Sequence, residues 1–239
     1  MIILVVGATG MTGRCLVEQL LDRNHEVRVI VRSSQKLSSA VLQNPNITVI
    51  EAAVLDLTDQ EMAEYARGCD AVVSCLGHVM DFSGMFGEPK KLCTDAARRL
   101  CIAIEENKPP EPIKFILMNT VGVANPDVDE KRTWYDRGIL FLLRHLLPPH
   151  RDNETAAEYL QHSIGKNNKH VEWCSVRPDS LIDAERSSYD ITESPVTGIL
   201  TGRPTARANV AQFMVQLIED AEHWGSWKFR MPVIMNSAR

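Results

Sequence analysis

Apolar positions at the start of the chain follow two different spacings. Residues 2–6 form a continuous apolar run that ends at Gly7, as in a strand buried on both faces of a parallel sheet. Apolar residues then recur at helical spacing over 16–21, and apolar and polar residues alternate over 27–31 as in a second strand. The first thirty residues therefore predict one strand, helix and strand unit.

The same rhythm continues through the next 150 residues. It predicts further strands at 47–52, 71–77, 114–121 and 171–176, and helices near 59–67, at 90–107 and around 156–160. Because helices separate these strands, the strands are expected to be parallel, with helices on the faces of the sheet. The predicted fold class is α/β, with a single doubly wound parallel sheet and a small C-terminal region that covers a substrate.

Two segments depart from this rhythm. Residues 122–150 form a long connection, and residues 179–206 are rich in Ser, Thr, Pro and Gly, so both are expected to cover a substrate pocket at the ends of the strands. Within the first segment, 139–147 is apolar on nearly every side and stops at two prolines, which predicts a short helix. Core packing is the ordinary interpretation of that helix, and a dimer contact or a substrate lid is the alternative.

Composition favours one globular domain spanning 1–239, with 44% hydrophobic and 24% charged residues. The net charge of -5 provides no basic field for nucleic acid, so a small-molecule partner is expected, with the protein a monomer or a homodimer. No apolar run is long enough for a membrane span, and the chain begins directly with a strand rather than a signal peptide. A cytoplasmic protein without a membrane partner is predicted.

The cysteines are interpreted as reduced structural residues. They contain no C-x-x-C pair, and most lie in apolar runs, where a thiol behaves as a small hydrophobe. The six are Cys15, Cys69, Cys75, Cys93, Cys101 and Cys174. No cluster with metal-ligand spacing stands out, so no metal site is expected.

A glycine-rich turn connects the first strand to the first helix. Without side chains, backbone N–H groups there can approach a diphosphate, and the helix N-terminus faces the anion with its partial positive charge. Its predicted cofactor contacts are Gly7, Thr9, Gly10, Met11, Thr12 and Gly13. The alternative is a tight turn without a ligand, but the strand before it and the helix and strand after it favour a Rossmann-type dinucleotide site.

The end of the second strand predicts which nicotinamide cofactor binds. A carboxylate there would accept a hydrogen bond from a ribose hydroxyl, whereas this strand ends in Arg32 and Ser33. A guanidinium can hold a 2′-phosphate with paired hydrogen bonds, and a hydroxyl adds a donor. NADP(H) is therefore expected in preference to NAD(H); a solvated surface arginine is the alternative, and Lys36 is a weaker second candidate.

From Gly7–Gly13 and Arg32 onward, the chain resembles the atypical short-chain dehydrogenase/reductases, specifically the NAD(P)H-binding group of NmrA-like proteins and biliverdin/flavin reductases. The segment 205–211 is similar to the one that leads into the last helix of that group. The resemblance implies cofactor contacts at Asp56 and Leu57 beside the adenine, at Leu76, Gly77 and His78, at Asn119, at Asn153, and at Pro178 after Arg177.

The catalytic pair of the typical enzymes is missing. Tyr135 is followed four residues later by Ile139 rather than lysine, and Tyr159 by Ser163. Hydride transfer is still possible, because the cofactor supplies the hydride and water can supply the proton. Candidate catalytic residues are Asn119, Thr120, His78 and Tyr135.

Each candidate catalytic residue also has an ordinary structural interpretation. Asn119 can satisfy backbone groups at the strand end, His78 can pack in a loop, and Tyr135 can pack as loop aromatics commonly do. The segment 151–154 opens a helix, with Asp152 or Asn153 as the expected N-cap.

The resemblance supports three hypotheses for function. The first is an NADPH-dependent reductase that acts without the Tyr-x-x-x-Lys pair on a conjugated acceptor such as a quinone, flavin, tetrapyrrole or enone. The second is a non-catalytic redox sensor of NmrA-like type, which the missing pair favours. The third, an epimerase for nucleotide sugars, is the least favoured, because the region after the sixth strand is short.

Overall fold

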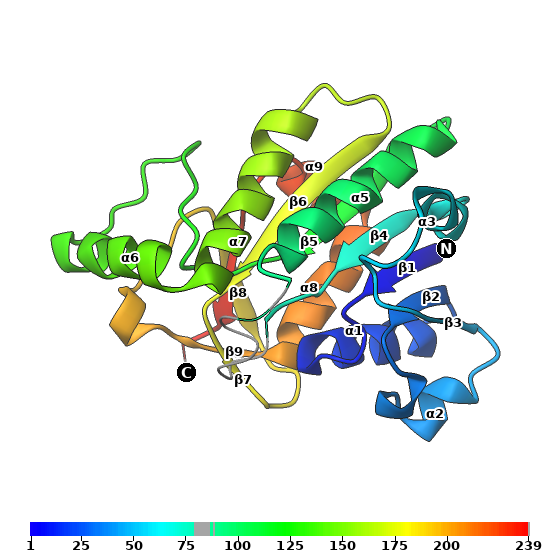
Figure 1. Cartoon of the computed structure of the whole chain (residues 1–239). Helices are drawn as coiled ribbons and strands as arrows, with labels where there is room; N and C mark the ends of the chain where they lie inside the picture. The colour runs from blue at the N-terminus through cyan, green and yellow to red at the C-terminus, as the bar shows by residue number, and fades with distance from the viewer. Residues whose placement is uncertain (79–86, 88, 239) are drawn as a thin grey trace.

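The computed structural model describes residues 1–78, 87 and 89–238, and places a sheet of eight strands at the centre of these residues (Figure 1). In spatial order the strands are β3 (Ile47–Glu51), β2 (Glu26–Val31), β1 (Ile2–Val6), β4 (Ala71–Ser74), β5 (Ile113–Met118), β6 (Val171–Pro178), β10 (Val233–Asn236) and β8 (Tyr189–Thr192). All neighbours pair in parallel except β8, which is antiparallel to β10. The predicted doubly wound α/β fold is confirmed.

Helices cover both faces of the sheet. The principal helices are α1 (Met11–Asp22), α2 (Ser39–Leu42), α3 (Asp59–Ala66), α5 (Leu92–Asn107), α6 (Trp134–Leu146), α7 (Pro148–Glu158), α8 (Arg207–Glu219) and α9 (Ala221–Trp227). Side chains of α1 and α8 share one core cluster, and those of α3, α5 and α7 share the other. Along β1, Ile3 and Val5 join the first cluster whereas Leu4 and Val6 join the second, because successive strand residues face opposite ways.

The six predicted strands all form, although two of them end three residues earlier than expected. β4 stops at Ser74 and β5 at Met118, so the residues after them form loops at the carboxyl edge of the sheet. β10, β8 and a separate parallel pair, β7 (Ser180–Ile182) with β9 (Pro204–Ala206), were not predicted. These strands are three or four residues long, and three of them, β7, β8 and β9, lie within 179–206, where turn-forming residues hide the alternation.

The helix predicted at 139–147 differs from the structure in extent and in packing. It begins at Trp134, where the Thr133 hydroxyl accepts a hydrogen bond from the backbone N–H of Asp136. Phe141 and Leu146 are 62% and 63% exposed, so core packing is the wrong interpretation of their apolar character. Among the residues that the structure describes, no helix is long and apolar enough to cross a bilayer.

The helix start predicted at 151–154 is also wrong. α7 begins at Pro148, whose fixed φ suits the first helical turn, so Asp152 and Asn153 lie inside the helix and neither is its N-cap. The cysteines agree better with prediction, since all six are free thiols and five of them are buried.

Candidate functional site

The glycine turn between β1 and α1 is shaped by close backbone contacts. Gly7 adopts a φ of +80°, and a Cβ there would lie 2.5 Å from the carbonyl carbon and oxygen of Cys75, beyond the end of β4. A Cβ on Gly13 would overlap the carbonyl oxygen of Gly7, to which Gly10 donates a backbone hydrogen bond of 3.0 Å. Only glycine fits at positions 7 and 13 without movement of the backbone.

The N-terminus of α1 meets the requirements of a diphosphate site. Its N-cap is Gly10, and among the described residues no side chain caps it and no acidic residue occupies its first turn. The first N–H groups of the helix, at Met11, Thr12 and Gly13, have no partner within the helix, and the helix dipole adds positive potential. An anion such as a dinucleotide diphosphate fits this position.

The end of β2 presents a cation and, beside it, an unexpected carboxylate. Arg32 is exposed and Ser33 is half-buried. Glu51, which ends the neighbouring strand β3, accepts a 3.1 Å hydrogen bond from the backbone N–H of Ser34, and hydrogen bonds from Ser34 lower the pKa of that carboxyl. Glu51 does not stand out in the sequence, because its contact depends on the register that places Glu51 opposite Val31.

The loop after β3 is held in place by Arg99 of α5. Its guanidinium donates hydrogen bonds to the carbonyl oxygens of Val54, Leu55 and Leu57. Leu57 is buried and Asp56 is exposed. This anchored loop follows the strand next to β2, so the arrangement allows Asp56 to face the adenine end of a dinucleotide.

A histidine and a buried aspartate meet beyond the end of β4. His78 Nε2 lies 2.8 Å from Asp152 Oδ2, and the Asp152 side chain is fully buried. The same carboxylate accepts backbone hydrogen bonds from Cys93 at 2.8 Å and Thr94 at 3.0 Å, at the start of α5. Asp152 therefore stabilises the N-terminus of a helix other than its own and also orients His78.

His78, Cys93 and Asp152 offer ligand atoms that all lie within 4.8 Å of one another. The oxygens of Asp152 already accept hydrogen bonds, and the Cys93 thiol donates to the carbonyl oxygen of Leu76. Burial, reinforced by the charge of Asp152, raises the pKa of Cys93 well above its ordinary value. A metal binds cysteine as the thiolate, whereas the raised pKa keeps Cys93 a thiol, so this group is better suited to hydrogen bonding than to metal binding. The absence of a metal site stays a prediction.

Asn119 and Thr120 lie directly after β5. The amide nitrogen of Asn119 donates to the carbonyl oxygen of Asn153 at 3.0 Å, and its amide oxygen accepts from the backbone N–H of Thr120 at 2.9 Å. Asn119 therefore bonds backbone groups at the strand end, as its structural interpretation predicts, and joins β5 to α7. Asn153 is thereby brought next to the end of β5.

His150 and Glu154 form a second pair on α7 that the sequence analysis missed. His150 Nε2 lies 3.5 Å from Glu154 Oε1, and a Cβ on Gly122 would lie 3.3 Å from the His150 ring. Burial lowers the pKa of His150 and raises that of Glu154. No local motif marks the pair, since an i, i+4 spacing of His and Glu is common on helix surfaces.

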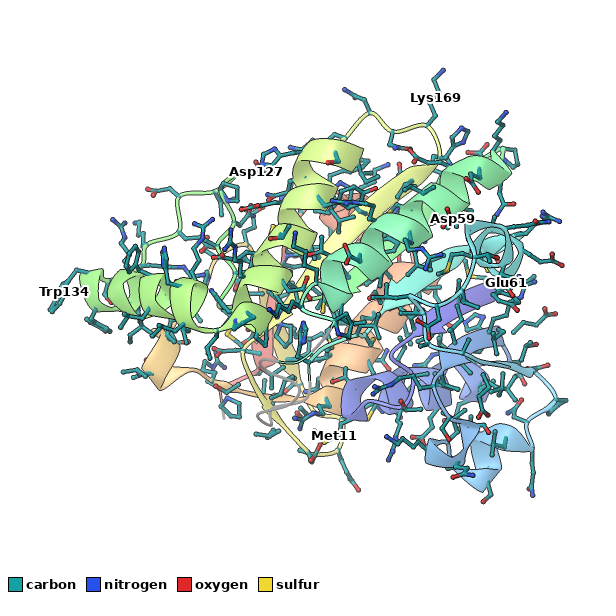
Figure 2. The ribbon with its side chains drawn as sticks, in the orientation of Figure 1. Met11, Asp59, Glu61, Asp127, Trp134 and Lys169 are labelled. Atoms are coloured by element: carbon teal, nitrogen blue, oxygen red, sulfur yellow. The ribbon has the colours of Figure 1, made fainter. Side chains whose placement is uncertain are left out.

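Arg177 and Pro178 end β6 beside the loop that follows β5, where the backbone N–H of Val121 donates a hydrogen bond to the carbonyl oxygen of Pro178. The Arg177 side chain is fully buried and bonds the carbonyl oxygens of Val123, Met231 and Glu193, and Pro178 is buried within β6. Tyr135 lies on the first turn of α6, beside Trp134, which projects at the far end of that helix from the body of the protein (Figure 2). The described contacts do not join Tyr135 to the group around His78.

A model of the NAD(P)H-binding protein family matches residues 7–221, beginning at the glycine turn. The chain belongs to the NAD(P)H-binding family. One relative in sequence is the chloroplastic divinyl chlorophyllide a 8-vinyl-reductase of Arabidopsis thaliana, 25% identical over 138 residues, which cover 54% of this chain and 32% of the plant protein. The chain spans about a third or less of the length of the plant relatives that it matches.

Solved structures of other proteins show the same NAD(P)H-binding fold. A short-chain dehydrogenase/reductase of Veillonella parvula in complex with NADP has a TM-score of 0.72 and 12% identity, covering 99% of this chain and 95% of that chain. The anaerobillin reductase ChuY of Escherichia coli O157:H7 has a TM-score of 0.69 and 16% identity, covering 100% and 98%. At such identities the likeness establishes the fold.

Proposed function

We propose that this protein is an NADPH-dependent reductase of a conjugated, largely apolar acceptor. The diphosphate would lie over the N-terminus of α1, and the 2′-phosphate against Arg32 and Ser33. Asp56 and Leu57 would border the adenine. The nicotinamide end would then extend toward the group formed by His78, Asn119 and Asn153 at the ends of β4 and β5. When bound, the cofactor supplies the hydride.

The observation that carries this proposal is the 2.8 Å contact between His78 and Asp152. Gly7 contacts the backbone of Cys75, three residues before His78, so the histidine and the diphosphate turn share one edge of the sheet. Asp152 holds the ring in one orientation, as acidic partners of catalytic histidines do. The proposed role of His78 is to donate the proton that completes reduction after the hydride has reached the acceptor.

The acceptor class follows from the chemistry and from the named similar proteins. Without a tyrosine and lysine pair, the alkoxide formed from a simple ketone would lack the stabilisation that this pair provides, whereas a conjugated acceptor spreads the charge that the hydride brings. ChuY and the Arabidopsis vinyl reductase are both named for such compounds. The proposed acceptor is therefore a tetrapyrrole or another extended conjugated ring system, bordered by the segments 122–150 and 179–206.

The test measures loss of NADPH absorbance with a panel that includes biliverdin, FMN, a short-chain quinone and an enone. The proposal predicts turnover with at least one conjugated member, and a decrease of about a hundredfold in kcat for His78→Gln. Because His78 is also a predicted cofactor contact, the affinity for NADPH is expected to change, but much less than kcat. Tight cofactor binding with no turnover across the panel would favour the redox-sensor hypothesis instead. Turnover that is unaffected by His78→Gln would remove the histidine from the mechanism and leave water as the proton source.

A further inference from the structure

Helix α6 lies within the segment 122–150 that is proposed to border the acceptor, yet the apolar surface that it exposes contains none of the residues assigned to the proposed reaction. Trp134, Phe141, Leu142 and Leu146 are 85%, 62%, 55% and 63% exposed. At about 100° per residue, these four side chains share an arc of roughly 140° on one side of the helix. Leu200, on the short 3₁₀ turn Ile199–Thr201 packed against α6, is 76% exposed and adds to the surface.

The opposite side of α6 fixes the helix to the protein. Asp136 is its only acidic residue, and that residue is buried. The carboxylate of Asp136 accepts hydrogen bonds from the Thr133 hydroxyl at 2.7 Å and from the backbone N–H of Ile199 at 2.9 Å. The apolar arc consequently faces outward in a fixed orientation, at the edge of the molecule far from α2 (Figure 1).

The charge around this arc is one-sided. Within α6 the two arginines, Arg137 and Arg144, are exposed, whereas the one acidic residue, Asp136, is buried. Arg137 and Arg144, seven residues apart, lie on one flank of the arc, and Lys131, Arg137 and Arg151 are exposed. Arg144 shares its charge with two glutamates of α7, Glu154 at 3.1 Å and Glu158 at 3.8 Å.

This charge distribution decides between the possible occupants of the surface. A second copy of the chain in a two-fold dimer would place the same surface against itself, and would bring its arginines toward the arginines of the partner. An anionic lipid bilayer complements both features, because its headgroups attract Lys and Arg and its acyl boundary accepts Trp, Phe and Leu. We infer that α6 docks the protein on the surface of an anionic membrane.

Such docking is peripheral, so it is compatible with the lack of a membrane-crossing helix among the described residues. It departs from the expectation that the protein has no membrane partner. It does not depend on the proposed reduction, because the surface is formed by α6 and the adjoining 3₁₀ turn, and it can be tested on protein without substrate.

Trp134 provides an internal probe for the test. Of the four tryptophans, Trp173 and Trp224 are buried at 1% and 5% exposure, and Trp227 is half-buried against the core. Trp134 is the exposed one, so transfer of a tryptophan from water to lipid is measured mainly there. The full chain is titrated with vesicles of phosphatidylcholine, with and without phosphatidylglycerol. The expected result is sedimentation with the anionic vesicles only, a shift of the emission to shorter wavelength, and quenching by brominated lipid. Trp134→Phe should remove the shift but keep the binding.

Two substitutions separate the apolar and the charged contributions. Phe141→Ser should weaken binding to anionic vesicles by about tenfold, and Arg137→Gln by about fivefold. The matched controls Leu42→Ser on α2 and Lys169→Gln, at the opposite side of the molecule from Trp134 (Figure 2), should leave binding unchanged. Equal binding to neutral vesicles, no binding at all, or a dimer in solution that Phe141→Ser dissociates would overturn the inference.

Discussion

His78 Nε2 lies 2.8 Å from Asp152 Oδ2, although the two residues are 74 positions apart in the chain. The aspartate is held by two backbone amides of α5, and it therefore cannot turn away from the ring without leaving those amides without a partner. The contact links the loop after β4 to α7 and fixes the geometry of the group proposed to lie beside the nicotinamide.

Asp152→Asn should reduce turnover by about tenfold or more and change its pH profile, because an amide can no longer accept the same hydrogen bond from a charged imidazole. It should also lower stability by about 1 kcal/mol, since the amides of α5 lose a charged partner. Steady-state kinetics across pH, together with urea unfolding, measure both effects. Glu158→Gln, an exposed change on the same helix, is the control. An unchanged pH profile would assign Asp152 a purely structural role.

Two glycine substitutions should have opposite effects on stability. Gly13→Ala places a Cβ against the carbonyl oxygen of Gly7 and should cost about 1–3 kcal/mol. Gly138→Ala, in the middle of α6 with nothing within 4 Å of the new Cβ, should stabilise by about 0.5–1 kcal/mol. Chemical unfolding of both variants tests the close packing of the turn. Equal changes in the free energy of unfolding for Gly13→Ala and Gly138→Ala would contradict the close packing of the turn.

Glu51 is expected to weaken NADPH binding, because its carboxylate already accepts the Ser34 N–H at the site proposed for the 2′-phosphate. Glu51→Gln should therefore lower the Kd for NADPH roughly fivefold by removing a like charge, and leave the Kd for NADH nearly unchanged. Arg32→Asp should act in the opposite direction on NADPH. Fluorescence titration of each variant with NADPH and with NADH measures the two Kd values. Equal changes in Kd for the two cofactors would show that the 2′-phosphate lies elsewhere.

The attachment of α6 should weaken in acid. Hydrogen bonds from the Thr133 hydroxyl and from the backbone N–H groups of Ile199 and Thr133 lower the pKa of Asp136 below its usual value. A depressed carboxyl pKa contributes stability above the pKa of the unfolded chain, and this contribution is lost as pH falls through the lower folded value. Asp136→Asn should thus be less stable than the natural protein at neutral pH, and the difference should shrink as the solution becomes acidic. Urea unfolding over a pH series measures it, with the exposed Asp129→Asn as the control.

The sequence predicted best those features that depend on neighbouring residues. The glycine turn and the strands on both sides of α1 follow from local spacing, and the structure places each of them as expected. β7 and β9 were not predicted, because each has only three residues and its partner lies more than twenty positions away. Local pattern contains little information about such short pairings.

The sequence predicted where the residues of the candidate site lie along the chain, but only some of the contacts that their side chains make. His78 and Asn119 follow the expected strands, yet the role of Asp152 depends on amides 58 and 59 positions away, and sequence spacing does not reveal that distance. Likewise, the apolar run of α6 resembles a core helix in sequence. Its exposure follows from the buried Asp136, whose hydrogen bonds with Thr133 and Ile199 fix that side of the helix to the protein and leave the apolar arc outside.

Calorimetric titration of the full chain with NADPH and with NADH tests the central claim most directly. Binding of one NADPH per chain, roughly tenfold or more tighter than NADH, is the predicted result for a diphosphate held by the amides of α1 and a phosphate held by Arg32. Folded protein that takes up neither dinucleotide would contradict the account.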